Sequence, residues 1–487
     1  MTNLDRRTLL KAGATAALTG PFTGYFALQA QGATRAKPRR GRLLDVADKR
    51  DGVVRLQLPR GFQYRSFQHA GEQLGDGTTI PGRHDGMAAF DARGNETYLV
   101  RNHEILGSGS AFAGGPVYDP AARGGTTNAV VRKNGKVVDS WASLAGTSGN
   151  CAGGPMPWGS WVTCEETVNG PDVFDDFNFG GGTSYVDNVN LQEKHGYVFD
   201  VPADGVSEAE PVKDAGRFAH EAIAYSPDDK AFYLTEDDFG FPSGFYRYVP
   251  PPRSRRLAEG GRLFMLAVAG QHLEDAKDVG RRYEATWVEI ENPDPTFPMS
   301  SDGSIPTTLN DQAIHAVAEQ GWSQGAAYFA RLEGAVYDNG IVYFTATQGG
   351  GDRFGAFDPA DPQPEPDGFG NGRGQIWAYH VDRQALELVY VSPGADVLDF
   401  PDNVTTSPRG TLVVCEDGTD GNFLRGLGTD GELFDIARNM IPKGTDIGGD
   451  EFAGSTFGGD GHTLFVNIQA SLGMSIAIWG PWHQIGV

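Results

Sequence analysis

The chain has 487 residues, with 40 Lys and Arg against 63 Asp and Glu, and its formal net charge is −23. A surface this negative argues against a nucleic-acid-binding protein. Three cysteines are too few for a disulfide framework, and no segment beyond the N-terminal region is long and apolar enough to span a membrane. The 68 glycines are typical of a loop-rich β protein. Together these features favour a cation-dependent or exported protein.

The N-terminal region predicts export. It contains the sequence Asp5-Arg6-Arg7-Thr8-Leu9-Leu10-Lys11, and a weakly apolar stretch follows to about Phe26. Paired arginines before such a stretch are typical of a twin-arginine signal, which carries folded proteins across the membrane. We expect residues 1–33 to be the signal, the export machinery to be a partner, and the mature protein to be periplasmic or extracellular. Without residues 1–42, which hold eight bases and one acid, the charge becomes 32 − 62 = −30.

Six short apolar runs share one pattern, because each stops abruptly at an acid, an Asn or a Gln. They occupy residues 98–104, 161–166, 232–237, 342–348, 412–417 and 464–469. Five of them follow a turn and an earlier strand-like piece that begins at an acid. Asn-Gly, Pro-Asp and Asp-Gly turns between apolar runs indicate β-hairpins. Repeated hairpins predict an all-β fold, a six-bladed β-propeller within one domain at residues 43–487, with its first hairpin in residues 61–104.

The spacing of the hairpins is irregular, so insertions are expected between blades. The largest spans about residues 239–330, and we expect it to form a cap over the mouth of the channel. Within it, residues 276–290 predict an edge strand or a helix, and residues 311–330 predict a helix. Another loop, residues 169–187, carries Asp172, Asp175 and Asp176 without a recognisable calcium-binding spacing, which favours a solvated loop.

Antiparallel geometry brings the acids of the hairpins together. The start of the first strand and the end of the second lie at the same end of a hairpin. Carboxylates crowded there repel one another unless cations neutralise them, so we predict a site for several metal ions. The residues expected at this rim are Asp85, Glu104, Cys151, Glu166, Glu221, Glu236, Asp237, Glu333, Asp402, Glu416, Asp417 and Glu451.

Two further residues refine the chemistry. Cys151 precedes a flexible Gly-Gly-Pro, and a thiolate among carboxylates suits iron or zinc, whereas an all-oxygen set suits calcium. Arg331 alternates with Glu333 and faces the same side of its strand. A guanidinium beside metal-bound carboxylates pairs with an acid or binds an anion such as phosphate.

A series of ordered motifs resembles the PhoX family of alkaline phosphatases from about residue 50 onward. The motifs lie at residues 101–104 (Arg-Asn-His-Glu), 150–154 (Asn-Cys-Ala-Gly-Gly), 158–166, 216–221, 235–237, 331–334 (Arg-Leu-Glu-Gly), 401–403, 451–454 and 480–482. The resemblance implies a six-bladed propeller exported by the twin-arginine route. It also implies two ferric and three calcium ions, and hydrolysis of small phosphomonoesters with release of phosphate.

The resemblance also implies roles for individual residues. Cys151, Glu166, Glu221 and Glu333 would hold the iron centre, and Arg331 would bind the phosphate oxygens. Further candidate ligands of iron or calcium are Glu104, Glu236, Asp237, Asp402, Glu416 and Glu451. The metals would act as Lewis acids on the phosphoryl group. Arg331, Cys151, Glu166 and Glu333 are thus the expected catalytic set.

Two other readings remain open from the residues alone. A calcium-dependent propeller hydrolase of the lactonase type would need only oxygen ligands, with no role for Cys151. A secreted binding propeller would use calcium for structure alone and would not depend on Arg331. In each case we expect a monomer.

Overall fold

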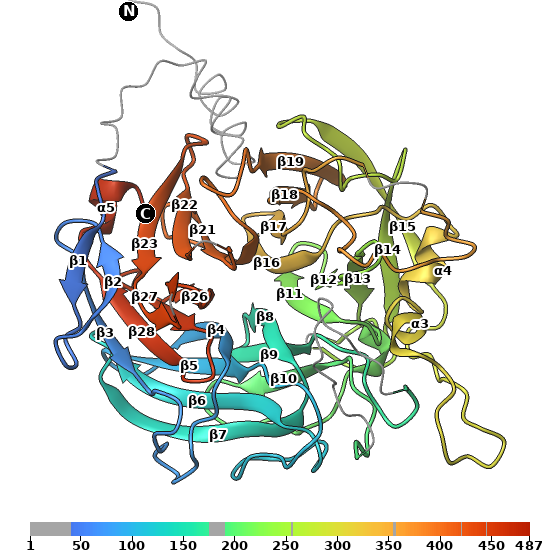
Figure 1. The fold of residues 1–487 in the computed structure, drawn as a ribbon, viewed down its shortest axis with the longest axis horizontal. Helices are drawn as coiled ribbons and strands as arrows, with labels where there is room; N and C mark the ends of the chain where they lie inside the picture. Colours follow the sequence, from blue (N-terminus) through green and yellow to red (C-terminus); the bar gives the residue numbers. More distant parts are fainter. Residues whose placement is uncertain (1–39, 175–189, 255–256, 354–356, 420, 445) are drawn as a thin grey trace, which may run out of the picture.

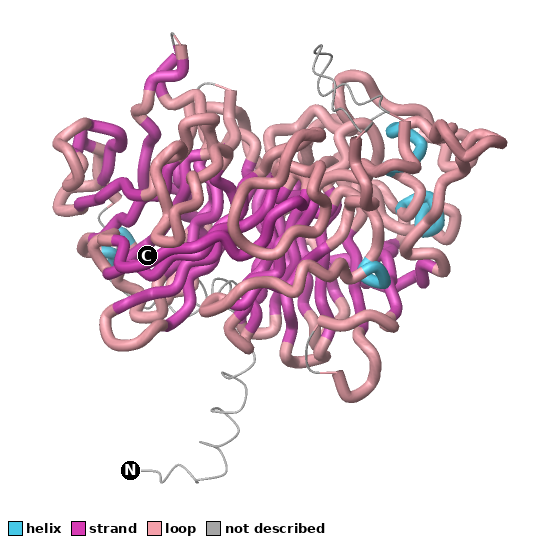
Figure 2. Tube along the Cα trace, turned by 90° about the horizontal axis from the view of Figure 1, so that it is seen from below, coloured by secondary structure: helices cyan, strands magenta, loops and turns pink. Residues whose placement is uncertain are grey.

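The computed structural model describes residues 40–174, 190–254, 257–353, 357–419, 421–444 and 446–487. The expected all-β class is confirmed, since antiparallel strands surround a central axis as in a propeller (Figure 1). In the view of Figure 2 the strands form the middle of the molecule and loops cover its two ends. The predicted signal, residues 1–33, lies outside the described part, as do Asp175 and Asp176. No helix within the described part is long and apolar enough to cross a membrane.

Four sheets of the ring are separate in their hydrogen bonding, and a small hairpin lies beside them. They comprise β4 (His84–Asp91), β5 (Glu96–His103), β6 (Gly124–Arg132) and β7 (Val137–Thr147); β8 (Asn150–Met156), β9 (Ser160–Glu165) and β10 (Val198–Pro202); β20 (Pro401–Thr406), β21 (Leu412–Glu416), β22 (Phe423–Leu427) and β23 (Leu433–Asn439), extended by β2 (Val54–Leu58) and β1 (Leu44–Ala47); and β26 (Phe452–Phe457), β27 (Thr463–Ile468), β28 (Met474–Trp479) and β3 (Gln63–Phe67). The hairpin is β24 (Pro442–Lys443) with β25 (Asp446–Ile447).

The rest of the ring is one nine-stranded sheet, so the expectation of six separate blades is wrong. Its strands, in order across the sheet, are β11 (His220–Ser226), β12 (Ala231–Glu236), β13 (Phe245–Val249), β14 (Arg262–Val268), β15 (Arg282–Ile290), β19 (Ala385–Val391), β18 (Gln375–His380), β17 (Ile341–Ala346) and β16 (Leu332–Asp338). The long β15 reaches beyond its own hairpins and pairs with β19, for example Tyr283 with Leu386. Two repeats are thereby fused at their outer edges into a nearly closed sheet.

The expected cap over residues 239–330 is also largely wrong. Strands β13 to β15 take up much of this segment, so most of it belongs to the sheet. Of the two alternatives for residues 276–290, a strand or a helix, the structure has the strand β15. The single helix expected at residues 311–330 is two short helices, α3 (Asn310–Ile314) and α4 (Ala318–Trp322). Gly321 and Gly325 are poor helix formers, and they lie where the second helix ends. The other short helices of the described part are η2 (Lys213–Ala215) and α5 (Trp482–Ile485).

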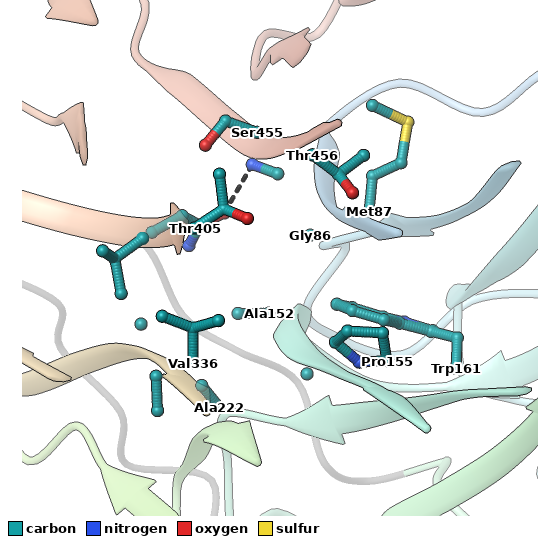
Figure 3. Close-up of a pocket in the computed structure, with 16 residues that line it drawn as sticks. Gly86, Met87, Ala152, Pro155, Trp161, Ala222, Val336, Thr405, Ser455 and Thr456 are labelled. Carbon is teal, nitrogen blue, oxygen red and sulfur yellow. Dashed lines mark hydrogen bonds between the residues drawn. The ribbon is translucent and has the colours of Figure 1, made fainter. Parts of the chain in front are cut away.

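The first strand of each predicted hairpin lies nearest the axis. Strands β4, β8, β11, β16, β20 and β26 contact one another in this order, and β26 closes the ring on β4. Glycine allows their backbones to approach: a Cβ on Gly154 would lie 1.6 Å from the Ile223 oxygen, and one on Gly334 would lie 2.7 Å from the Asn403 Cα. A cavity of about 50 Å³ remains along the axis, where all six strands line it (Figure 3).

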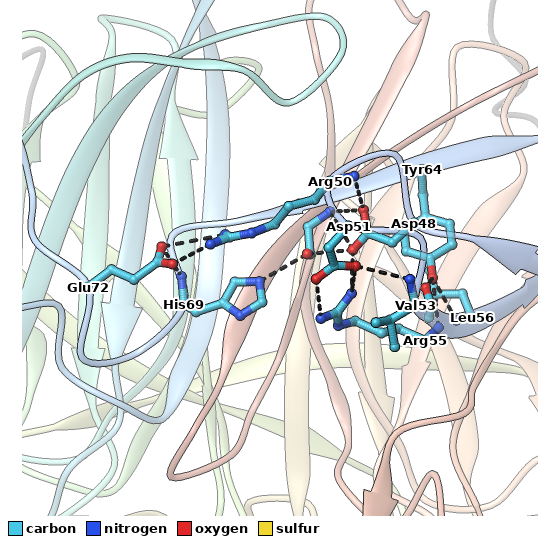
Figure 4. Close-up of polar contacts among 10 residues, drawn as sticks. Asp48, Arg50, Asp51, Val53, Arg55, Leu56, Tyr64, His69 and Glu72 are labelled. Carbon is cyan, nitrogen blue, oxygen red and sulfur yellow. Dashed lines mark hydrogen bonds and ion pairs between the residues drawn. The ribbon is translucent and has the colours of Figure 1, made fainter.

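The N-terminal strands close the ring by joining sheets made from the C-terminal part of the chain. β2 pairs with β23 through Leu56 and Asn439, and β3 pairs with β28 through Phe67 and Ser475. Residues 63–67 therefore complete the last sheet and are no part of the first hairpin, because that hairpin is β4 with β5. A polar network ties the two N-terminal strands to each other (Figure 4). At its centre the buried Asp48 accepts hydrogen bonds from the Ser66 hydroxyl (2.5 Å) and Arg55 (2.8 Å).

Candidate metal centre

A β-bulge interrupts the hydrogen-bond ladder near the start of all six inner strands. In β4 the pairing jumps from His84 to Met87, and the same jump of three residues occurs in β8, β11, β16, β20 and β26. A bulge leaves an extra residue outside the ladder and re-aims its side chain. In the first five of these strands the first residues inside the bulge are Asp85, Cys151, Glu221, Glu333 and Asp402, whereas in β26 this residue is Gly454. The repeat thus presents one metal-binding side chain from each of five strands at the same level.

Two groups of these side chains could each hold a metal ion. The ligand atoms of Cys151, Glu166 and Glu221 all lie within 4.8 Å of one another, and so do those of Glu221, Glu333 and Asp402. Glu221 belongs to both groups. Glu166 comes from the second strand of its hairpin, directly after β9. These five residues, one thiol and four carboxylates, are among the twelve that the sequence analysis expected at the rim.

The remaining acids of the cluster act on one another electrostatically. Burial raises the pKa of Glu104 and that of Asp402 to about 7 each. Burial also raises the pKa of Glu451 well above its usual range, and the carboxylates of Asp417, Asp402, Asp85 and Glu104 add to the effect. Crowded carboxylates with such pKa values must bind protons or cations at neutral pH.

Arg331 forms ion pairs with two acids of this cluster. Its Nε donates to Asp237 Oδ1 at 2.9 Å, one terminal nitrogen also contacts Asp237, and the same nitrogen donates to Glu333 Oε1 at 3.1 Å. The Arg331 side chain is 21% exposed, and its backbone has a φ of 51°. Positive φ is uncommon for a residue with a side chain. The guanidinium is thus held at the surface of the cluster by two acids while part of it meets solvent.

Two candidate ligands lie outside the cluster. Glu236 accepts hydrogen bonds from the Gly244 N–H and the Tyr246 hydroxyl, both at 2.8 Å. Glu416 accepts from the Asp399 N–H (3.0 Å) and from Arg425 Nε (2.8 Å). Successive side chains of a strand point to opposite faces. In the pairs Glu236–Asp237 and Glu416–Asp417 only the second acid therefore faces the axis, and the structure does not support the first as a ligand.

Asp85 and Asp417 are the cluster members that the ligand candidates left out. Both were expected at the rim, and both raise the pKa values of buried neighbours, Asp85 that of Glu221 and Asp417 that of Glu333. The position of Asp417 could have been inferred from the alternation in the pair Glu416–Asp417. That of Asp85 depends on the bulge, for which its neighbour Gly86 is the only signal in the sequence.

A buried polar chain supports the end of β9, next to Glu166. The Glu165 carboxylate accepts hydrogen bonds from the N–H groups of Ser148 (2.9 Å) and Gly196 (2.9 Å), and from His195 Nδ1 at 2.6 Å. His195 Nε2 lies 3.4 Å from Asp119 Oδ2. The two acids overcome the effect of burial and raise the pKa of His195 to about 9. A charged histidine between two carboxylates thus anchors the strand that carries Glu166.

Replacement of His195 by glutamine is expected to lower the free energy of unfolding by about 3 kcal/mol at pH 6, because it leaves two buried carboxylates without their counter-charge. The folded pKa of about 9 lies above the ordinary 6.5. The stabilisation is therefore complete below pH 6.5 and disappears as the pH rises through 9. Unfolding measured between pH 6 and 10 should show wild type and H195Q converging at the alkaline end. A difference that stays constant with pH would contradict a charged His195.

The donor set fits the metals that the sequence analysis expected. Cys151 brings a soft thiol to the first group, as a transition metal such as iron prefers, whereas the second group offers only carboxylate oxygens, as calcium prefers. Burial and the charges of Glu221, Glu166 and Asp85 raise the pKa of the Cys151 thiol. A bound cation would reverse this effect and hold the thiolate. The cluster as a whole is suited to several cations.

The chain was compared with curated proteins and with solved structures. No curated protein matches the chain. Among solved structures, PhoX of Pseudomonas fluorescens in complex with vanadate, a transition state analogue, has a TM-score of 0.63 and 18% identity, over 91% of this chain and 98% of that chain. A gluconolactonase from Xanthomonas campestris (TM-score 0.37, 13% identity, 92% of this chain and 100% of that chain) and virginiamycin B lyase from Staphylococcus aureus (0.36, 9%, 86% and 99%) are more distant.

The sequence itself is matched by the family described as alkaline phosphatase PhoX, over residues 43–142 and 136–471. This match covers most of the chain and includes every residue of the cluster. The chain therefore belongs to the PhoX family of alkaline phosphatases.

Proposed function

We propose that the chain hydrolyses small phosphate monoesters at a centre of iron and calcium ions on the propeller axis. The observation that carries the proposal is the cluster itself, in which a thiol and several buried or half-buried carboxylates gather near the partly exposed Arg331. Cations bound there would supply Lewis-acid stabilisation of the phosphoryl group. The family resemblance sets the expected content at two ferric and three calcium ions.

The proposed ligands divide according to their chemistry. Cys151, Glu166, Glu221 and Glu333 would hold iron. Iron or calcium would be bound by Glu104, Asp237, Asp402 and Glu451, which the sequence analysis named, and by Asp85 and Asp417, which the structure adds. Glu221 belongs to both ligand groups, so it is suited to connect two neighbouring ions. Glu165 and His195 would keep Glu166 in place through their hydrogen bonds.

Arg331 would bind the phosphoryl oxygens. Its planar guanidinium offers several N–H donors in a fixed geometry, which suits the oxygens of a phosphate. Asp237 and Glu333 hold the side chain in position before substrate arrives. Charge that develops on the equatorial oxygens would be stabilised without further rearrangement of the arginine.

The rival enzyme of the lactonase type is less well supported. It would bind calcium through oxygen ligands and would have no use for a thiol at its centre. Cys151 is nevertheless buried, and it forms one candidate metal group with Glu166 and Glu221. Its place in the cluster favours the phosphatase.

The test combines metal content with activity on the purified mature protein. We expect elemental analysis to give iron near two and calcium near three per chain, and p-nitrophenyl phosphate to be hydrolysed. Removal of calcium by a chelator should lower the rate by more than about 100-fold, because even residues that only orient metal ligands change activity 10–100-fold. Re-addition of calcium should restore the rate. Calcium without iron, together with no hydrolysis, would refute the proposal.

We further propose that the mature chain acts in the periplasm or outside the cell as a monomer. The Arg6-Arg7 pair and the apolar stretch after it support export by the twin-arginine route. Export in the folded state would allow the metals to be bound before the protein crosses the membrane. Replacement of Arg6 and Arg7 by lysine would be expected to retain the protein in the cytoplasm.

A further inference from the structure

A second arginine occupies the same place in the repeat as Arg331. Arg83 precedes Asp85 by two residues, as Arg331 precedes Glu333, and Asp85 and Glu333 are the first residues of their bulges. Both arginines have a φ of 51°. Phe400, two residues before Asp402, has the same φ, so this conformation belongs to the repeat. Shared backbone conformation and shared register direct the two side chains alike.

The partners of the two arginines also correspond. Arg331 binds Asp237, the first residue after β12, whose hairpin precedes β16 in the ring. Arg83 donates to the side chain of Gln469 at 3.2 Å. Gln469 is the first residue after β27, whose hairpin precedes β4 in the ring. The repeat thus has an acid beside one arginine and a neutral amide beside the other.

Because Gln469 stands where Arg331 has the acid Asp237, Arg83 has no counter-charge in direct contact among the described residues. None of the ion pairs formed within the described ranges includes Arg83, whereas Arg331 has two. Gln469 in turn donates to Asp85 Oδ2 at 2.6 Å, so the amide connects Arg83 to the acid cluster. The charge of Arg83 also opposes the rise in the pKa of Glu104, which places the guanidinium near that acid. Arg83 is exposed, directly before the buried His84 and Asp85, at the edge of the centre.

The two arginines lie on opposite sides of the centre. In the ring order β4, β8, β11, β16, β20, β26, strand β16 is three places from β4 in either direction. A phosphoryl group bound at Arg331 therefore has Arg83 across the cluster from it. A guanidinium in that position, with no ion pair among the described residues, is suited to an anionic group.

We infer that Arg83 binds a second anionic group, a phosphate or a carboxylate, on the alcohol part of the substrate. The inference rests on the proposed phosphatase function and deepens it, because it names the preferred class: phosphate monoesters whose leaving alcohol carries another negative charge. Arg83 is thus a specificity residue, distinct from Arg331, which holds the phosphoryl group that is transferred. The strongly negative surface of the protein repels anions. A positive side chain such as Arg83 is therefore needed to bind the second anionic group of the substrate.

The test compares alkanediol bisphosphates of increasing chain length with the matching monophosphates. The series of lengths covers different distances between the guanidinium groups of Arg83 and Arg331. The measured quantity is the ratio of kcat/KM for the bisphosphate to that for the monophosphate. We expect wild type to prefer the bisphosphate at one or more lengths. R83Q should lower this ratio about ten-fold, as the loss of one charge-assisted hydrogen bond predicts, and R83K should retain part of it.

The matched control is R93Q. Arg93 is exposed in the turn between β4 and β5, at the other end of the same hairpin. R93Q changes the net charge by the same amount, so it reports long-range electrostatic effects, and a constant ionic strength screens them further. Its ratio should equal that of wild type. An R83Q ratio equal to that of wild type, or an equal loss for both substrates, would overturn the inference. Neither result would affect the proposed function, which depends on hydrolysis of the monophosphate by wild type.

Discussion

Replacement of Glu221 by glutamine is expected to remove most of the bound metal and to lower kcat by more than about 100-fold. Glu221 is the residue common to both candidate metal groups, so its loss weakens two sites at once. Residues that merely orient metal ligands already cost 10–100-fold, and a shared ligand should cost more. The measurements are elemental analysis of the purified variant and its rate with p-nitrophenyl phosphate.

The matched control for this variant is E236Q. Glu236 is a buried glutamate in the same hairpin, and its carboxylate accepts hydrogen bonds from Gly244 and Tyr246, away from the axis. Burial raises its pKa well above the usual range, so a neutral amide of the same shape is a mild change. E236Q should retain metal and activity. If E236Q lost metal while E221Q retained it, the assignment of the inward acids would be wrong.

Replacement of Arg331 by alanine is expected to lower kcat/KM by about 10² to 10³-fold, the effect of removing one preorganised group that stabilises charge in the transition state. Lysine at this position should recover only part of the loss, because it provides charge without the planar fork. Vanadate, which resembles the phosphoryl group in transfer, should inhibit R331A less strongly than wild type. These kinetic measurements need only the wild type and the two variants.

Metal content distinguishes this role from a structural one. Arg331 also neutralises Asp237 and Glu333, so its removal could disturb the ligands. We expect R331A to keep iron and calcium at the wild-type level while it loses activity. A parallel loss of metal and activity would show that Arg331 acts by holding the acids in place.

The sequence was sufficient to predict the strands nearest the site. All six apolar runs that end in a polar residue are the second strands of hairpins, from β5 to β27. These runs are reliable because alternation and turn residues are local signals. The number of separate sheets was not predictable in this way. It depends on the pairing of β15 with β19, which are about 100 residues apart and whose edges carry no signal of their own.

The same distinction between local and distant information applies to the site. Cys151, Glu221 and Glu333 were predicted from their place at the start of repeated strands, and the structure brings them together. Glu416 was kept as a ligand candidate although alternation lets only one acid of the pair Glu416–Asp417 face the axis. The bulges of the inner strands, which direct Asp85 and the corresponding residues of the other strands inward, are features of backbone geometry. No spacing of residues in the sequence marks them, so they could not be predicted.

The closure of the ring has a consequence for biosynthesis. β3 leaves the ribosome long before its partner β28. Contacts between such distant parts of a chain form slowly. The propeller therefore cannot be completed before β28 has been synthesised, and the centre cannot form before Glu451 and Gln469 have joined the acids of the first hairpin. Metal loading becomes a step that follows synthesis of β28, and a product that ends before β26 would be unable to assemble the centre.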